Sequence, residues 1–381
     1  MNEKEVRELR RRFRADKGNF RNVFGCFVND ARKIISLFEQ PLVGVASDEA
    51  ERYLGLMKKT LSGSLDKNLY NLEFSAGQVL DSPEYQLLNG LLTSGLADEE
   101  QIKLFFQRII DGLEIKGSYL ILLARDVYPV PYRAKDGERL DDAADEEFMY
   151  LTCAVCPVKV TQPQLSYSSA ENRFHSSAQG FIASAPALGF LFPAFDGRAS
   201  NLYGALYYAR NAAETHAELA NALFHTELPM PAAAQKEQFE DILGVTLSDE
   251  CSFDVLQSVH EELCNMIERH EESDAEEDLT VSKGELGGIL KASGVSDEHI
   301  AAFEKQFDLT FGADAAIPPK NVVDRKSFEI RTPDATVKVN PERSDLVELS
   351  VIDNHKYILV RAEGGVTVNG VDANFTANKR Q

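Results

Sequence analysis

The sequence predicts an α+β fold with a mixed N-terminal domain, a helical middle section and a small all-β C-terminal module. The chain has 381 residues, of which 44% are hydrophobic, so it can bury a sizeable core. Its hydrophobic residues follow both helical and strand periods in the first part of the chain and the helical period after about residue 212. The chain ends in short β-rich runs between turns. At roughly 100–200 residues per domain this length predicts two or three domains, which we place at 1–230, 231–310 and 320–381.

The N-terminal domain is predicted to contain short helices and a group of strands. Val6, Leu9 and Phe13 form a narrow apolar stripe at helical spacing, and Asp48 and Glu49 suit the first turn of a helix. Helices are therefore expected at 3–14, after Ser47, at 83–94 and at 98–112. Runs rich in β-forming or apolar residues predict strands at 22–28, 118–128, 147–160 and 202–209. The polar segment between the middle two strands is expected to be a long exposed connection, and 178–201 to be irregular backbone.

The rest of the chain is predicted to be helical to about residue 310 and β-rich after 320. The best helix covers 252–270, and its side chains predict one buried stripe formed by Phe253, Leu256, Val259, Leu263, Met266 and Ile267. The acidic run 268–278 is typical of a solvated hinge or linker, and Ser282 with Glu285 forms a capping-box pair that opens another helix. Strands are expected at 326–332, 335–339, 346–352, 356–361 and 365–368. Such a meander is expected to fold as a small barrel or sandwich.

The charge of the chain disfavours two classes of partner. Its net charge is −21, from 61 acidic and 40 basic side chains, and a field of that sign repels nucleic acid and anionic membranes. Residues 1–21 are the exception, with eight basic and four acidic side chains. That helix could touch nucleic acid or an acidic partner, but its arginines also suit the helix dipole and the acids of the protein body. Because neither a signal peptide nor a membrane-spanning run is evident, we expect a cytoplasmic location.

Cysteine and acidic motifs do not predict a metal or redox site. Cys153 and Cys156 fall in a predicted strand, where residues three apart point to opposite faces and lie about 10 Å apart, too far to bridge. We therefore expect buried thiols, and the sequence does not decide whether they have a redox role. His260 and Cys264 share a helix face, but a metal would need a further ligand, such as Cys251. The acidic residues of 136–145 depart from the calcium-loop pattern, so no metal site is expected.

The most suggestive segment is FLFPAFDGRASN, residues 190–201. Asp196, Arg198 and Asn201 follow an apolar run at a turn, and polar groups on such segments beside a core are typical of binding sites. Arg198 could bind a phosphate or carboxylate with two parallel hydrogen bonds. The alternative is an internal Asp196–Arg198 pair that orders the turn.

Four segments resemble a known bacterial family. They are TLSGSLDKNLYNLEF (60–74), CPVKVTQPQLSY (156–167), GFLFPAFDGRASNLYGALYYARNA (189–212) and VNPERSDLVELSVIDNHKYILV (339–360). Together they are similar to the family catalogued as domain of unknown function 4317, along essentially the whole chain. The resemblance implies a bacterial cytoplasmic protein and assigns no catalytic residue, but it draws attention to 193–201 and 340–345 as candidate sites.

The sequence favours a non-enzymatic binding or adaptor protein, because no nucleophile–base or metal constellation is matched. Its partner would be a protein or a small anionic ligand, and the sequence names no cofactor. The alternative is a hydrolase or transferase that acts on a phosphorylated or nucleotide-like ligand. In that case Asp196 would act as acid–base or metal ligand, while Arg198 and Arg343 would bind the anion.

Overall fold

The computed structural model describes residues 1–133, 139–169, 171–176, 178–273, 278–362 and 364–374, without the side chains of 132–146. The chain separates into two compact units, Met1–Pro231 and Ala232–Gln381. Each unit is described by itself. The predicted α+β class is confirmed.

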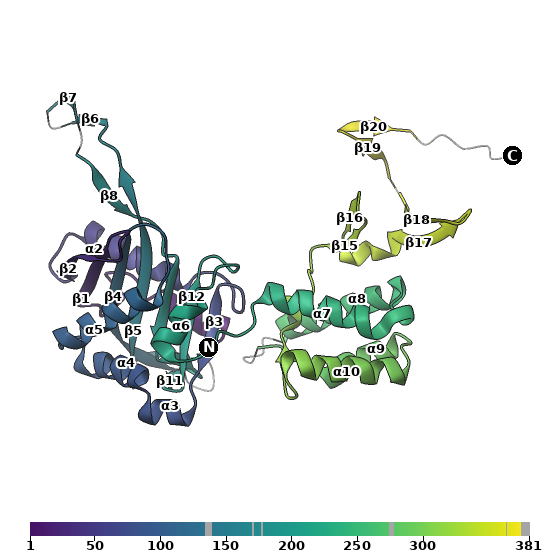
Figure 1. The fold of residues 1–381 in the computed structure, drawn as a ribbon, viewed down its shortest axis with the longest axis horizontal. Helices are drawn as coiled ribbons and strands as arrows, with labels where there is room; N and C mark the ends of the chain where they lie inside the picture. The colour runs from purple at the N-terminus through teal and green to yellow at the C-terminus, as the bar shows by residue number, and fades with distance from the viewer. Residues whose placement is uncertain (134–138, 170, 177, 274–277, 363, 375–381) are drawn as a thin grey trace. The chain divides into compact units, whose positions relative to one another are not determined.

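The first unit is built on an antiparallel sheet with the strand order β2-β1-β4-β5-β9-β12-β3, and β8 pairs with the far end of β5 (Figure 1). Its strands are β1 (Asn22–Val28), β2 (Ile34–Pro41), β3 (Leu69–Glu73), β4 (Tyr119–Arg133), β5 (Arg139–Thr161), β8 (Gly180–Ala183), β9 (Leu188–Phe192) and β12 (Gly204–Ala209). The four predicted strands are confirmed. The expected irregular backbone at 178–201 is wrong, since that stretch supplies β8, β9 and a small hairpin.

The central hairpin β4–β5 is longer than predicted. The expected exposed connection is wrong from Arg139 onward, because those residues already pair with β4, with register shifts near Pro131. Polar side chains do not prevent this pairing, since the main chain makes the ladder hydrogen bonds. Of the acidic connection, residues 134–138 lie outside the described part of the chain.

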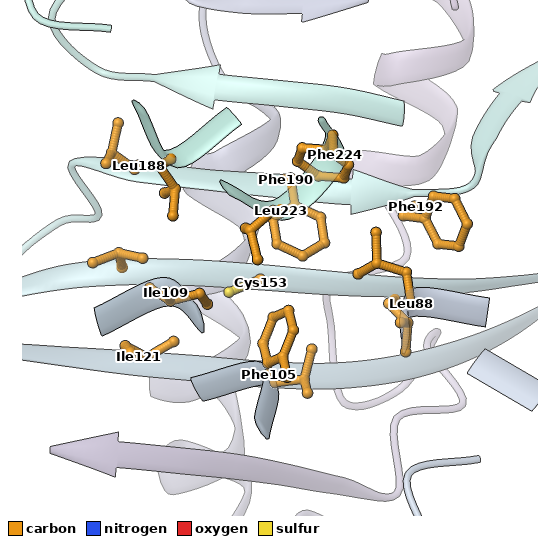
Figure 2. Close-up of a cluster of buried hydrophobic side chains, with 14 of the residues drawn as sticks. Leu88, Phe105, Ile109, Ile121, Cys153, Leu188, Phe190, Phe192, Leu223 and Phe224 are labelled. Carbon is orange, nitrogen blue, oxygen red and sulfur yellow. The ribbon is translucent and has the colours of Figure 1, made fainter. Parts of the chain in front are cut away.

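Both faces of the sheet are covered by helices. On β4, Ile121 and Leu123 join one buried cluster while Leu122 and Ala124 join the other, as the alternation of a strand requires. Helices α4 (Pro83–Ser94), α5 (Glu99–Gly112) and α6 (Ala217–Phe224) pack on the first face, where Phe105, Phe190 and Phe224 meet (Figure 2). Helices α1 (Glu3–Arg10) and α2 (Ser47–Lys58) pack on the second.

The two strand cysteines follow the same alternation. Cys153 lies in the cluster of the first face (Figure 2) and Cys156 in that of the second. Burial raises the pKa of Cys156 to about 12 and that of Cys153 well above its usual range. The prediction of two buried thiols on opposite faces is confirmed.

Two small hairpins and a short helix complete the first unit. β6 (Leu165–Ser168) pairs with β7 (Arg173–Ser176), and β10 (Ala194–Asp196) pairs with β11 (Ala199–Asn201). A short helix, α3 (Ala76–Asp81), precedes α4, and Ser75 caps it through a capping box with Gln78. The hairpin β10–β11 contains the predicted site.

The second unit begins with helices. They are α7 (Ala232–Leu247), α8 (Phe253–Glu272), α9 (Lys283–Ala292), α10 (Asp297–Phe311) and the single turn α11 (Pro319–Val322). The capping box between Ser282 and Glu285 is confirmed at the start of α9. Two-residue strands β13 (Val281–Ser282) and β14 (Ala316–Ile317) pair antiparallel between the helices. Helix α7 packs against α10 and α11, with Phe239 edge-on to Phe303.

Helix α8 differs from its prediction in two respects. Its buried residues are Val255, Val259, Leu263 and Ile267, whereas Leu256 is 37% exposed. A strict spacing of four residues selects this stripe, so the broader predicted stripe is wrong at the exposed Leu256, while Phe253 and Met266 are half-buried and Met266 packs against the buried cluster. The helix also continues to Glu272, so the first half of the predicted acidic linker is helical.

The last part of the chain forms three hairpins. They are β15 (Phe328–Arg331) with β16 (Thr336–Val339), β17 (Val347–Ile352) with β18 (His355–Val360), and β19 (Val366–Val368) with β20 (Val371–Ala373). Two of the tight turns contain left-handed residues, Asp353-Asn354 and Asn369-Gly370. In the described residues each hairpin is a separate two-stranded sheet, so a closed barrel joined by hydrogen bonds is not formed.

Candidate functional site

The hairpin β10–β11 brings two of the predicted site residues together and directs the third elsewhere. Asn201 donates from Nδ2 to Asp196 Oδ2 at 3.3 Å across the hairpin. Arg198, at the turn with φ +62°, donates from Nη1 to both Glu8 oxygens at 2.7 and 2.5 Å. Its Nη2 donates to the Pro131 carbonyl at 2.9 Å. The ion pair at this turn therefore joins Arg198 to Glu8 of α1, and it fixes the turn against that helix.

The fourth predicted residue belongs to the other unit. Arg343 lies in a 3-10 turn, Pro341–Leu346, where its Nε donates to Asp345 at 3.2 Å. Both side chains of this pair are about half exposed, at 44% and 53%. The pair therefore sits at the surface of the second unit.

A buried network lies next to the first helix on the second face of the sheet. The Asp126 carboxylate is fully buried and accepts hydrogen bonds from Arg12, from the Asn19 main chain at 2.6 Å and from Tyr150 Oη at 2.9 Å. Burial, and then the Asp126 charge, hold the pKa of Tyr150 well above its usual range. We call these four residues the Asp126 network. Arg12, one of the arginines of the basic N-terminal segment, therefore has a structural role in this network.

The network continues to the hairpin. The Arg12 guanidinium lies 4.8 Å from the centre of the Tyr128 ring, and Tyr128 Oη donates to Glu8 at 2.7 Å. Burial and this hydrogen bond raise the pKa of Tyr128 to about 12. Because Glu8 also binds Arg198, the charged groups from Arg198 to Asp126 all have partners.

A large cleft opens beside the same stretch of β4, and its lining includes Arg125 and Val127 of that strand and Asn19 of the Asp126 network. It has a volume of about 1140 Å³ and lies between the segment after α1, the neighbouring ends of β1 and β2, and the turn from α4 to α5. We call it the Arg125 cleft, after the charged β4 residue in its lining. Its other charged lining residues are Arg14, Arg21, Glu39 and Glu99.

Arg125 is a half-buried residue of this cleft whose charge is not compensated within the described residues. It is half-buried on β4, its Nη2 faces the sulfur of Met149 at 2.9 Å, and its buried Nε has no hydrogen-bond partner. A thioether is a weak acceptor, and a buried donor without a partner costs about 1–3 kcal/mol. No ion pair involving Arg125 occurs within the described residues. This guanidinium therefore has no carboxylate partner among the described residues, although Arg125 lines the cleft.

The other charged groups of the cleft differ in how they are used. Arg14 pairs with Asp16 at 2.9 Å, and Glu39 accepts a hydrogen bond from Asn22. The side chain of Arg21 is exposed and has no hydrogen bond or ion pair in the part of the chain described. Arg21 and Arg125 thus provide two uncompensated positive charges to one cleft.

Sequence reasoning missed Arg125 although a signal was present. The segment LILLARDVY places adjacent charges, Arg125 and Asp126, inside an otherwise apolar strand. Neighbouring strand residues point to opposite faces, so each charge needs a partner of its own. The sequence could not show that one of them finds none.

The helical pair considered for a metal has other contacts. Cys264 Sγ lies 3.7 Å from His260 Nδ1, and His260 Nε2 lies 3.2 Å from the Asp324 carbonyl. Burial lowers the pKa of His260. Within the described residues, no group of three or more His, Cys, Asp or Glu side chains is arranged so that it could hold a metal ion.

Comparison with known proteins gives a family and no further likeness. A family described as a domain of unknown function (DUF4317) matches residues 1–371. No curated protein and no solved structure matches the chain. In the described part of the chain, no helix is long and apolar enough to cross a membrane.

Proposed function

Because the chain belongs to the DUF4317 family, whose description names no activity, we propose a function from the geometry: the first unit binds a small anionic ligand in the Arg125 cleft. The observation that carries the proposal is the half-buried guanidinium of Arg125, which lacks a carboxylate and leaves Nε without an acceptor. A phosphate or carboxylate would supply the missing charge-assisted hydrogen bonds.

The charge of the lining supports a small ligand. Three arginines and two glutamates line the cleft of a chain whose net charge is −21. A local positive site in a strongly negative field attracts a compact anion, whereas an extended polyanion would meet the acidic surface around it. Leu42, Leu54 and Phe24 add apolar lining for the body of such a ligand.

Binding without catalysis agrees better with the contacts than a hydrolase or transferase does. The enzyme alternative depended on Asp196 and Arg198, and these side chains bind Asn201 and Glu8. No described residue lining the Arg125 cleft is a His or Cys, which are common bases and nucleophiles. These contacts therefore support an anion-binding role better than a catalytic one.

The test compares two variants of the full chain by thermal unfolding with sodium phosphate or sodium succinate, against sodium chloride at equal ionic strength. At least one anion should raise the unfolding temperature of the wild type saturably. Arg125→Met should weaken that anion by about tenfold or more, because a hydrogen bond to a charged group contributes about 1.5–3 kcal/mol. Arg10→Met, at an exposed position of α1, should bind as the wild type does.

Two results would contradict the proposal. One is a wild type whose unfolding temperature responds to neither anion at millimolar concentration. The other is an Arg125→Met protein that keeps the full response. A response to phosphate alone would define a phosphate ligand, and one to succinate alone a carboxylate.

A further inference from the structure

A methionine faces Arg125 across the sheet. Val127 of β4 is paired with Met149 of β5, so Met149 lies diagonally across from Arg125 on the same face. Its sulfur accepts a hydrogen bond from Arg125 Nη2 at 2.9 Å. Because a thioether is a weak acceptor, this contact satisfies the guanidinium poorly.

The contact differs from those of comparable arginines in this chain. Arg12, Arg108 and Arg198 are also partly buried, and each of them binds a carboxylate. At Arg125 the position across the sheet is occupied by a sulfur atom instead. The chemical state of that sulfur therefore decides how well Arg125 is satisfied by its own chain.

Met149 is also the most accessible methionine. All five methionines lie in the described residues, and Met149 is 38% exposed whereas Met57 is fully buried. The others are half-buried: Met1, Met230 and Met266. The neighbours of Met149 in the strand, Phe148 and Tyr150, point to the opposite face and are buried there. A chemical change at the Met149 sulfur therefore reaches Arg125 without opening the core.

We propose that Met149 is a site of reversible oxidation, and that its sulfoxide binds Arg125 and so closes the Arg125 cleft to anions. Hydrogen peroxide transfers one oxygen atom to the thioether: the O–O bond breaks, the sulfur loses two electrons, and the peroxide is reduced to water. Methionine sulfoxide reductases reverse the change. The closing of the cleft rests on the proposed anion binding, whereas the oxidation of Met149 and its hydrogen bond to Arg125 do not.

The sulfoxide oxygen suits the guanidinium of Arg125. The sulfur already touches Nη2, and the methionine side chain has three rotatable bonds, so an oxygen on the sulfur can turn toward the donors. Hydrogen bonds to a charged group are about twice as strong as those between neutral groups. Among the described residues, no oxygen binds Arg125 in the reduced protein. In the oxidised protein its own chain supplies one, which an anion must displace.

Limited oxidation of the full chain with hydrogen peroxide tests the modification site. Peptide mapping by mass spectrometry should find Met149 oxidised before the other methionines. Urea unfolding then compares the wild type with Arg125→Leu, a variant that adds no further methionine. Oxidation should shift the unfolding midpoint more favourably in the wild type, because only there does the sulfoxide gain the guanidinium as a donor. Met149→Leu corrects for oxidation elsewhere in the chain.

The closing of the cleft is tested by titration with sodium phosphate or sodium succinate. Oxidation of the wild type should weaken the anion that binds by about tenfold or more, since a charge-assisted hydrogen bond must be displaced. Met149→Gln carries an amide oxygen in place of the sulfoxide oxygen and should weaken the anion similarly without peroxide. Met149→Leu should have the same anion affinity before and after peroxide treatment.

The possible failures are distinguishable. If the reduced and oxidised wild type bind the anion equally, the closing of the cleft is overturned and the anion site stands. If the reduced wild type binds neither anion, the proposed function and the closing fail together. The modification site is judged separately from both. It is overturned if Met149 is not oxidised first, or if oxidation shifts the wild type and Arg125→Leu equally.

Discussion

Two adjacent charged residues of strand β4 point to opposite faces and have opposite environments. On one face Asp126 accepts hydrogen bonds from three neighbouring residues and is fully buried. On the other face Arg125 meets only a thioether and a cleft. A charge that is closed off by its own chain contributes to the fold, whereas one left open to a cleft marks a place for a ligand.

The largest loss of stability is expected when the Asp126 network is broken. Asp126→Asn leaves the Arg12 guanidinium, whose side chain is 14% exposed, without its counter-ion. Removing one partner of a buried ion pair costs about 3–5 kcal/mol, and urea unfolding of the full chain should show a loss of this size. Asp16→Asn breaks the exposed Arg14 pair and should cost less than about 1 kcal/mol. Equal losses would show that the Asp126 network is not closed.

A smaller effect is expected where the network reaches the hairpin. Tyr128→Phe removes the hydrogen bond to Glu8 and should cost about 1.5 kcal/mol at pH 7. Because the fold raises the pKa of Tyr128 to about 12 from an unfolded value near 10, its contribution is present below pH 10. It is lost as the pH rises from 10 toward 12.

The measurement for Tyr128 is the free energy of unfolding as a function of pH. The wild type should lose more stability than Tyr128→Phe between pH 10 and 12, so the difference between the two proteins should shrink. A difference that stays constant across this range would mean that Tyr128 titrates normally in the folded protein.

The smallest change in stability is expected for Arg125, on the face of β4 that is open to the cleft. Arg125→Met removes a charge that no carboxylate of the described residues compensates, so the free energy of unfolding should stay within about 1 kcal/mol of the wild type or rise. Arg12→Met is the matched variant, and it should lose several kcal/mol because Asp126 is then buried alone. Parallel losses would remove the distinction between the two faces.

Sequence reasoning predicted contacts between residues close in the chain and missed contacts between distant ones. The opposite faces of Cys153 and Cys156 and the Ser282–Glu285 capping box were predicted correctly, since both follow from local geometry. The partner of Arg198 was not predicted, because Glu8 lies 190 positions away and nothing in the local sequence pattern selects it over Asp196.

Strand β2 and the end of α8 show two other limits. Residues 34–41 are mostly exposed, so they lack the buried alternation that identifies a strand. The acidic run 268–278 was interpreted by its composition as a linker, whereas its residues up to Glu272 belong to α8. Charge composition alone does not distinguish a solvated helix end from a linker.

Helix α7 completes the apolar core of the second unit. Phe239, Ile242 and Leu243 of this helix belong to the buried apolar cluster of the unit, and α7 packs against α10 and α11. A chain that begins after α7 would consequently expose the apolar faces of α10 and α11 to water, so the helices of this unit depend on their first member.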